Sequence, residues 1–173
     1  MTTVDPPAAG KKAAHSPSEM NHLAGKYMTF KLAEEEYGLE ILKVRDVIGL
    51  MEITKVPRTE DYIRGVINLR GKVIAVVDLR LKFGMAPTEL SDQTVIIVVQ
   101  LVRDGKEFTM GILVDEVLEV LDIGADQIEP PPDFGNQGME TDFILGVGKA
   151  ENRVIILLDI GKALSPGNAE TVR

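Results

Sequence analysis

Few side chains in this sequence are of the types that carry out catalysis or hold a metal. Cysteine is absent, and the two histidines, His15 and His22, both lie within the first 22 residues. The rest of the chain therefore lacks imidazole, the commonest general base and metal ligand. Carboxylates cluster at 34–36 and at Asp115 and Glu116, but neighbouring strand residues point to opposite faces. We expect these carboxylates to be solvated surface, and we expect no catalytic residue, cofactor or metal.

Composition and charge exclude further classes of function. The segment from Gly65 to Gly71 lacks the Lys-Ser/Thr and the following helix of a phosphate-binding loop. The chain has 173 residues and a net charge of −8, with 19 Lys and Arg against 27 Asp and Glu, so nucleic acid is not the expected partner. The longest apolar runs have five residues, whereas a membrane-spanning helix needs roughly 20, so we expect no membrane insertion.

An internal repeat organises the chain. A shift of 81 residues places 63–66 on 144–147 and 72–79 on 153–160, with hydrophobic positions and an Asp retained. A shift of 73 residues places Gly38 on Gly111. It also places the apolar residues at 41, 44, 47 and 48 on those at 114, 117, 120 and 121. Two blocks in the same order indicate duplication of one structural unit. The second copy contains a loop that is longer by eight residues.

Each copy is rich in Val and Ile and is punctuated by Gly, Pro and Asp-Gly, a pattern that favours short strands. Short helical turns are expected at 79–83 and 160–164, with Asp78 and Asp159 as their N-caps. Short strands with tight turns, twice over, indicate an all-β fold of two small barrels packed side by side. The expected strands are 27–32, 37–41, 45–50, 65–68, 73–78, 95–101, 108–121, 143–148 and 154–159.

The expected domain boundaries follow the repeat. Residues 1–26 contain Pro, Gly, Ala and Ser without periodicity, which predicts a disordered N-terminal tail. A single domain spans 27–165, with a first barrel at about 27–88 and a second at about 89–165. Strand exchange between the two barrels is left open. Residues 166–173 are expected to be a C-terminal tail.

The two copies differ at one turn and in their charge. Gly71 falls on Asn152, and both residue types tolerate positive φ, so this pair is read as a shared turn. Arg70 falls on Glu151, a charge reversal that turn formation does not require. Residues 27–88 carry a net charge of +1, and 89–173 carry −10. These differences favour two unlike docking surfaces, with Arg70 and Leu69 at the tip of one of them.

The stretch Ile63-Arg64-Gly65-Val66-Ile67-Asn68-Leu69-Arg70-Gly71-Lys72-Val73-Ile74-Ala75-Val76-Val77-Asp78-Leu79-Arg80 resembles the CheW family of bacterial chemotaxis coupling proteins. The resemblance extends upstream through 36–44 and downstream through 111–117 to Leu164. It implies two five-stranded SH3-like barrels without catalytic activity. It also implies a cytoplasmic adaptor, recruited to the inner face of the membrane, that couples the cytoplasmic tips of methyl-accepting chemoreceptors to the histidine kinase CheA.

Candidate partner-binding residues come from matching the family's motifs. The resemblance implies receptor and array contacts by Arg70 in Asn68-Leu69-Arg70-Gly71, and receptor binding by Val95 and Ile96 in a groove between the barrels. It implies that Val44, Arg45 and Asp46 meet the regulatory domain of CheA, which is itself similar to CheW. Other CheW-like domains in array rings are further candidate partners. A coupling protein of a parallel chemosensory pathway and a small-molecule-binding barrel remain alternatives.

Overall fold

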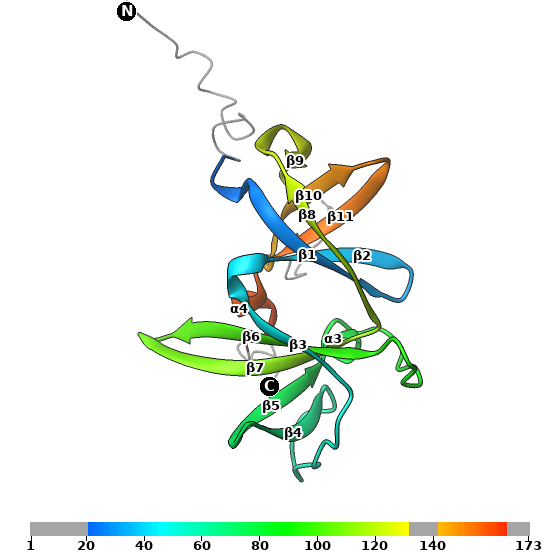
Figure 1. Ribbon diagram of the computed structural model, residues 1–173, viewed down its shortest axis with the longest axis vertical. Helices are drawn as coiled ribbons and strands as arrows, with labels where there is room; N and C mark the ends of the chain where they lie inside the picture. The colour runs from blue at the N-terminus through cyan, green and yellow to red at the C-terminus, as the bar shows by residue number, and fades with distance from the viewer. Residues whose placement is uncertain (1–20, 132–141, 166–173) are drawn as a thin grey trace, which may run out of the picture.

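The protein is described here by a computed structural model, which covers residues 21–131 and 142–165. Its strands form a six-stranded sheet, in the upper half of Figure 1, and a five-stranded sheet, in the lower half. The expected all-β fold of two SH3-like barrels is therefore confirmed. The strands are β1 Gly25–Leu32, β2 Glu35–Glu40, β3 Val44–Gly49, β4 Ile63–Leu69, β5 Lys72–Asp78, β6 Val95–Arg103, β7 Lys106–Val114, β8 Glu116–Ile123, β9 Ile128–Glu129, β10 Ile144–Ala150 and β11 Arg153–Leu158.

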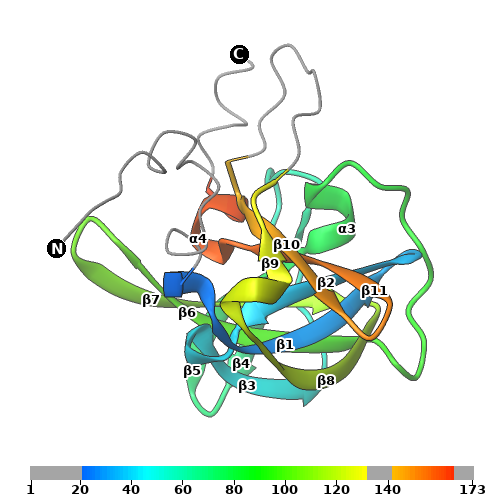
Figure 2. The ribbon, with the colours of Figure 1, turned by 90° about the horizontal axis from the view of Figure 1, so that it is seen from above.

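We call the six-stranded sheet, in the order β8-β1-β2-β11-β10-β9, barrel 1, and the five-stranded sheet, in the order β3-β6-β7-β5-β4, barrel 2. The sixth strand of barrel 1 is the two-residue β9, which the sequence pattern did not predict. Two α-helical turns lie on one side of the molecule, close to the junction of the barrels (Figure 2). The helical elements are η2 Asn21–Leu23, η3 Ile41–Lys43, α3 Leu79–Lys82, η4 Ala125–Gln127 and α4 Ile160–Ala163.

The two sequence repeats exchange their first hairpins. The first repeat contributes β1 to β5, yet β1 and β2 lie in barrel 1, between β8 and β11 of the second repeat. In the same way β6 and β7 of the second repeat lie in barrel 2, between β3 and β5. The expected division near residues 88 and 89 thus separates the repeats, whereas each barrel draws strands from both. The exchange that the sequence left open is present.

The registers of the strands follow the repeat residue by residue. Gly38 lies opposite Leu157 in the parallel pair β2–β11, and its counterpart Gly111 lies opposite Val76 in β7–β5. A Cβ atom at Gly38 would come within 3.1 Å of the Leu157 side chain, and one at Gly111 within 2.8 Å of the Ile96 side chain. Both glycines therefore permit close packing inside a barrel.

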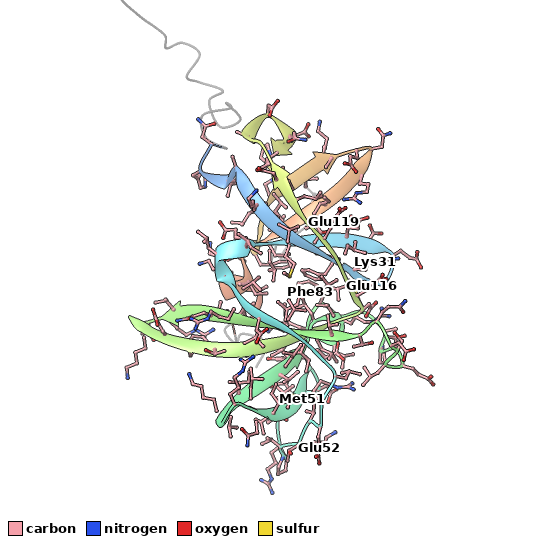
Figure 3. The ribbon with its side chains drawn as sticks, in the orientation of Figure 1. Lys31, Met51, Glu52, Phe83, Glu116 and Glu119 are labelled. Carbon is pink, nitrogen blue, oxygen red and sulfur yellow. The ribbon has the colours of Figure 1, made fainter. Side chains whose placement is uncertain are left out.

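The largest hydrophobic cluster lies between the barrels. It joins side chains of β1 and β2, such as Phe30 and Leu39, to side chains of β6 and β7, such as Ile97 and Ile112, all of them fully buried. Phe83 extends this contact and is labelled between the two sheets in Figure 3; its ring stacks on Phe143 with a centroid distance of 5.1 Å. Each barrel also has a smaller interior cluster of its own. Because the main core is shared, we expect the barrels to fold together.

Two local predictions about the helical turns are confirmed. The Asp78 carboxylate accepts hydrogen bonds from the backbone N–H groups of Arg80 and Leu81 at 3.1 and 3.3 Å. The Asp159 carboxylate accepts one from Lys162 at 3.1 Å. Both aspartates are thus N-caps, of α3 and α4 respectively.

Two other predictions are corrected. The expected strand 108–121 is two strands in different barrels, because β7 ends at Val114 and β8 begins at Glu116. The expected tail 1–26 includes η2 and the start of β1, and Leu23 is buried. Residues 21–26 therefore belong to the folded part of the chain. The rest of that tail, residues 1–20, and the tail 166–173 lie outside the described residues.

Candidate surfaces for binding partners

The turn between β4 and β5 presents Arg70 in a conformation that its own side chain does not favour. Arg70 and Gly71 have φ values of 51° and 85°, as in a two-residue type I′ hairpin turn. The Asn68 side chain accepts a hydrogen bond from the Gly71 N–H at 3.0 Å, so Asn68 supports the turn. A left-handed conformation costs an ordinary L-residue about 1–2 kcal/mol relative to glycine or asparagine. An arginine here is therefore explained by its side chain rather than by the turn.

The Arg70 side chain reaches the neighbouring strand β3. Its guanidinium donates to the Asp46 carboxylate at 2.9 Å; the Arg70 side chain is 74% exposed and that of Asp46 is 29% exposed. The hydrogen bond from Arg70, together with one from the Val47 N–H, lowers the pKa of Asp46 below its ordinary value. Arg70 and Asp46, which the sequence assigned to different partners, thus form one ion pair.

This ion pair lies in a surface pocket of barrel 2. We call it the basic pocket, because three cationic side chains surround one carboxylate and give a formal charge of +2. The register of β3 shifts between Val44 and Asp46, and such a bulge allows the consecutive residues Arg45 and Asp46 to line the same pocket. Arg45 is anchored by a hydrogen bond to the Gln100 side chain. The lining residues are Arg45, Asp46, Leu69, Arg70, Lys72, Ile74, Val98 and Thr109.

Barrel 1 carries the repeat's counterpart of the basic pocket, with the charge inverted. Asp46 corresponds to Glu119, Arg70 to Glu151, Lys72 to Arg153, and Thr109 to Glu36. Three carboxylates and one cation give −2, and we call this set, Glu36, Glu119, Glu151 and Arg153, the acidic counterpart. Figure 3 labels Glu119 on β8 in the upper barrel.

Arg153 holds the acidic counterpart together. Its guanidinium lies 3.0 Å from Glu119 and 3.6 Å from Glu36. The hydrogen bond to Glu119 is the main reason that the pKa of Arg153 is raised. The turn residues Glu151 and Asn152 have φ values of 50° and 69°, so the β10–β11 turn has the same left-handed form as the β4–β5 turn. The expectation of a shared turn is confirmed, and the outward-facing charges are what differ.

The remaining predicted residues have unequal access to solvent. Ile96 is fully buried inside barrel 2, whereas Val95 is half-buried against the cluster between the barrels. Consecutive strand residues face opposite sides, so they cannot line one groove, and the prediction for Ile96 is corrected. Leu69 is half-buried against the interior of barrel 2 rather than exposed. Val44 is half-buried and packs against the inter-barrel cluster.

Sequence reasoning missed part of the surface. Lys72 and Thr109 line the basic pocket, and only a full comparison of the two repeats, which pairs them with Arg153 and Glu36, could have indicated them. It also missed a groove between the β3–β4 connection, where Figure 3 labels Met51, and the chain that follows α3. This groove is lined by Leu50, Met51, Ile53, Lys55, Asp61, Ile63, Arg64, Leu81, Pro87 and Leu90.

Two further features of the described residues concern metal binding and the membrane. Within 21–131 and 142–165, no three His, Asp or Glu side chains are grouped so that they could hold a metal ion. In the same part of the chain, no helix has the length and apolar character needed to cross a bilayer.

The chain as a whole is similar to proteins of one family. A family model described as the CheW-like domain matches residues 26–166. The chemotaxis protein CheW of Klebsiella aerogenes is 39% identical over 140 residues, which cover 81% of this chain and 81% of that protein. The CheW of Bacillus subtilis is 31% identical and covers 84% of this chain and 90% of its own length. The crystal structure of the scaffolding protein TtCheW from Thermoanaerobacter tengcongensis has a TM-score of 0.68 at 40% identity, and covers 78% of this chain and 88% of that one.

Proposed function

Because this chain belongs to the CheW-like domain family, whose members are non-catalytic scaffolds of chemotaxis, we propose that it couples chemoreceptors to the histidine kinase CheA in signalling arrays. That it is a chemotaxis scaffold protein and not an enzyme follows from the family. The partners and the residues that bind them are the proposal. In this role the protein works in the cytoplasm and is held at the inner face of the membrane by the receptors.

The observation that carries the proposal is the Arg70–Asp46 ion pair in the basic pocket, which brings the predicted receptor-binding and kinase-binding residues together. The equivalent surface of opposite charge on barrel 1 can hold a further partner at a fixed separation. The basic pocket has a formal charge of +2 in a chain whose net charge is −8, so local charge and not net charge selects its partner. The acidic counterpart selects a basic partner in the same way.

We assign the β3 side of the basic pocket to the regulatory domain of CheA. Val44, Arg45 and Asp46 provide one half-buried apolar side chain beside two charged ones, a composition suited to a specific interface. The turn Asn68–Gly71 and Val95 provide the receptor contact. The Arg70–Asp46 ion pair then joins the two sites, because a receptor that draws Arg70 away from Asp46 changes the charge that the kinase meets.

The same charges suit contact with other CheW-like domains in array rings. The acidic counterpart of one molecule complements the basic pocket of the next, and the two surfaces lie on different barrels. Such a head-to-tail contact is heterologous, and it closes into a ring when its rotation permits.

Charge reversal at Arg70 tests the receptor assignment. Arg70→Glu places a second carboxylate beside Asp46, so we expect loss of receptor recruitment in a pull-down with receptor fragments, while thermal melting shows a folded protein. Lys106→Glu is the matched control, because Lys106 is an exposed cation in the β6–β7 hairpin, outside the basic pocket. Recruitment of the Arg70→Glu protein at the level of the Lys106→Glu protein would contradict the assignment.

Val44→Asp tests the kinase assignment. The new carboxylate would be buried without a partner at the interface, so calorimetric titration with the CheA regulatory domain should show binding weakened at least tenfold. Val73→Asp is the control, because Val73 is 67% exposed in the same barrel and lies outside the basic pocket. Equal affinity of the two variants for the regulatory domain would refute the assignment.

A further inference from the structure

The chain passes from barrel 2 back to barrel 1 through a single residue, Asp115. This residue lies between the end of β7 and the start of β8. In Figure 3 the labels Lys31, on β1, and Glu116, at the start of β8, mark the place where β8 enters barrel 1. The sequence reading treated Asp115 as solvated surface, but its side chain is only 26% exposed.

Both barrels bind Asp115. From barrel 2, the Arg80 guanidinium donates to its carboxylate at 2.7 Å. From barrel 1, the Ala33 N–H donates to the same carboxylate oxygen at 2.8 Å, and the Asp115 N–H donates to the Lys31 carbonyl at 3.1 Å. One carboxylate oxygen therefore joins α3 of barrel 2 to the β1–β2 turn of barrel 1.

Arg80 is itself held in place on several sides. Its side chain is 14% exposed, and its Nε–H donates to the Ala86 carbonyl at 3.0 Å. Its backbone N–H is bound by the N-cap Asp78. A guanidinium fixed in this way has a defined direction as well as a charge, and such charge-assisted hydrogen bonds are the stronger ones.

The other crossing between the barrels lacks an equivalent carboxylate. The chain passes from β2 to β3 through η3, and the repeat places Leu42 at the position of Asp115. Leu42 is 91% exposed. The ion pair is therefore not a general requirement for crossing between barrels, since the fold makes the same crossing without one.

We propose that Arg80 and Asp115 are a positioning pair that sets the angle between the two barrels. The shared hydrophobic cluster keeps the barrels in contact but is not directional, whereas the Arg80–Asp115–Ala33 bonds are directional. With the proposed function, the pair fixes the geometry between the partners bound on barrel 2 and a CheW-like domain bound at the acidic counterpart on barrel 1. That consequence rests on the proposed function, but the angle itself does not.

Distances between spin labels test the proposal, and the absence of cysteine lets labels be placed freely. Val102→Cys and Val154→Cys form a pair across the barrels, and Val73→Cys and Val102→Cys form a pair within barrel 2; all three positions are more than 60% exposed. In Asp115→Asn and in Arg80→Gln, we expect the inter-barrel distance distribution to broaden or shift. The distribution within barrel 2 should not change.

The control is Asp122→Asn, which removes a β8 carboxylate whose ion pair with Lys26 is more than half exposed on both sides. Unchanged inter-barrel distances in both test variants would overturn the proposal. Broadening of both label pairs would also overturn it, because the ion pair would then only support the fold. If Asp115→Asn does not fold, Arg80→Lys keeps the charge but not the Nε bond to Ala86, and the same two distributions are read. Unchanged distances together with kinase binding by the unmodified protein would refute this proposal alone. Altered distances in the variants together with no kinase binding by the unmodified protein would refute the proposed function alone.

Discussion

Gly65→Ala is the substitution with the largest effect that the structure predicts for β4. Gly65 has a φ of 141°, and a Cβ atom there would lie within 3.0 Å of the carbonyl carbon and oxygen of Thr54 and of the Ile53 side chain. Backbone strain in this glycine-only region costs about 1–3 kcal/mol, and overpacking against backbone about 1–3 kcal/mol more. We expect the free energy of unfolding to fall by about 2–6 kcal/mol.

The assay is urea unfolding followed by circular dichroism, with two glycine controls that separate the causes. Gly71 has a φ of 85° but nothing within 4 Å of a built Cβ, so Gly71→Ala carries strain alone, about 1–2 kcal/mol. Gly49 has open space and no positive φ, so Gly49→Ala should be neutral or stabilising by up to about 1 kcal/mol. Thermal melting should show Gly65→Ala lower than wild type by roughly 5–20 °C.

The three variants should unfold at increasing urea concentrations in the order Gly65→Ala, Gly71→Ala, Gly49→Ala. If Gly65→Ala unfolds at the same urea concentration as Gly71→Ala, the close approach of Thr54 to β4 is not a constraint on the protein. The reasoning that the Thr54–Val66 bridge holds the β3–β4 connection against β4 would then fail.

Three further predictions concern single buried polar groups. Burial raises the pKa of Tyr27 to about 12, and the Tyr27 hydroxyl donates to the Leu23 carbonyl at 2.5 Å. The fold therefore favours the neutral phenol over the phenolate. The contribution of Tyr27 to the free energy of unfolding is full below pH 10 and is lost as the pH rises towards 12. Phenolate absorbance should show a late step that Tyr27→Phe removes, and identical titrations would contradict this. Thr29 is fully buried, and its hydroxyl both donates to the Glu119 carbonyl of β8 and accepts from the Glu119 N–H. Thr29→Val should therefore lower the free energy of unfolding, measured in urea, by about 1–3 kcal/mol. An unchanged free energy would contradict this prediction. Asp78→Ala should lower the free energy of unfolding more than Asp159→Ala does in the same assay, because Asp78 is buried and also pairs with the Arg64 guanidinium at 3.4 Å. Equal losses in the two variants would show that only the N-cap hydrogen bonds contribute.

Local patterns in the sequence predicted most of the strands and both helical turns. Val and Ile runs, turn residues and N-cap aspartates each act within a few neighbouring residues, so they can be read without the tertiary structure. The repeat also predicted the shared left-handed turn at Gly71 and Asn152, because equivalent positions share backbone conformation. What failed locally was the run 108–121, where one residue, Asp115, ends a strand in one barrel and begins another. Nothing in its strand-forming composition marks that change of sheet.

The basic pocket could not be predicted as one site, because it is formed by residues that are far apart in the sequence and meet only in the folded protein. Arg70 and Asp46 are 24 positions apart, and no spacing rule relates a turn to the strand beside it. The pairing of hairpins across the repeats was equally hidden, since a strand pattern does not say which edge it will meet. The error at Ile96 was avoidable, because alternation along β6 already places Val95 and Ile96 on opposite faces.

The exchanged hairpins determine how the protein can be divided. Each barrel takes two strands from the other repeat, so a cut between the repeats would remove strands from both barrels at once. The two halves would then have to reassociate to rebuild either sheet.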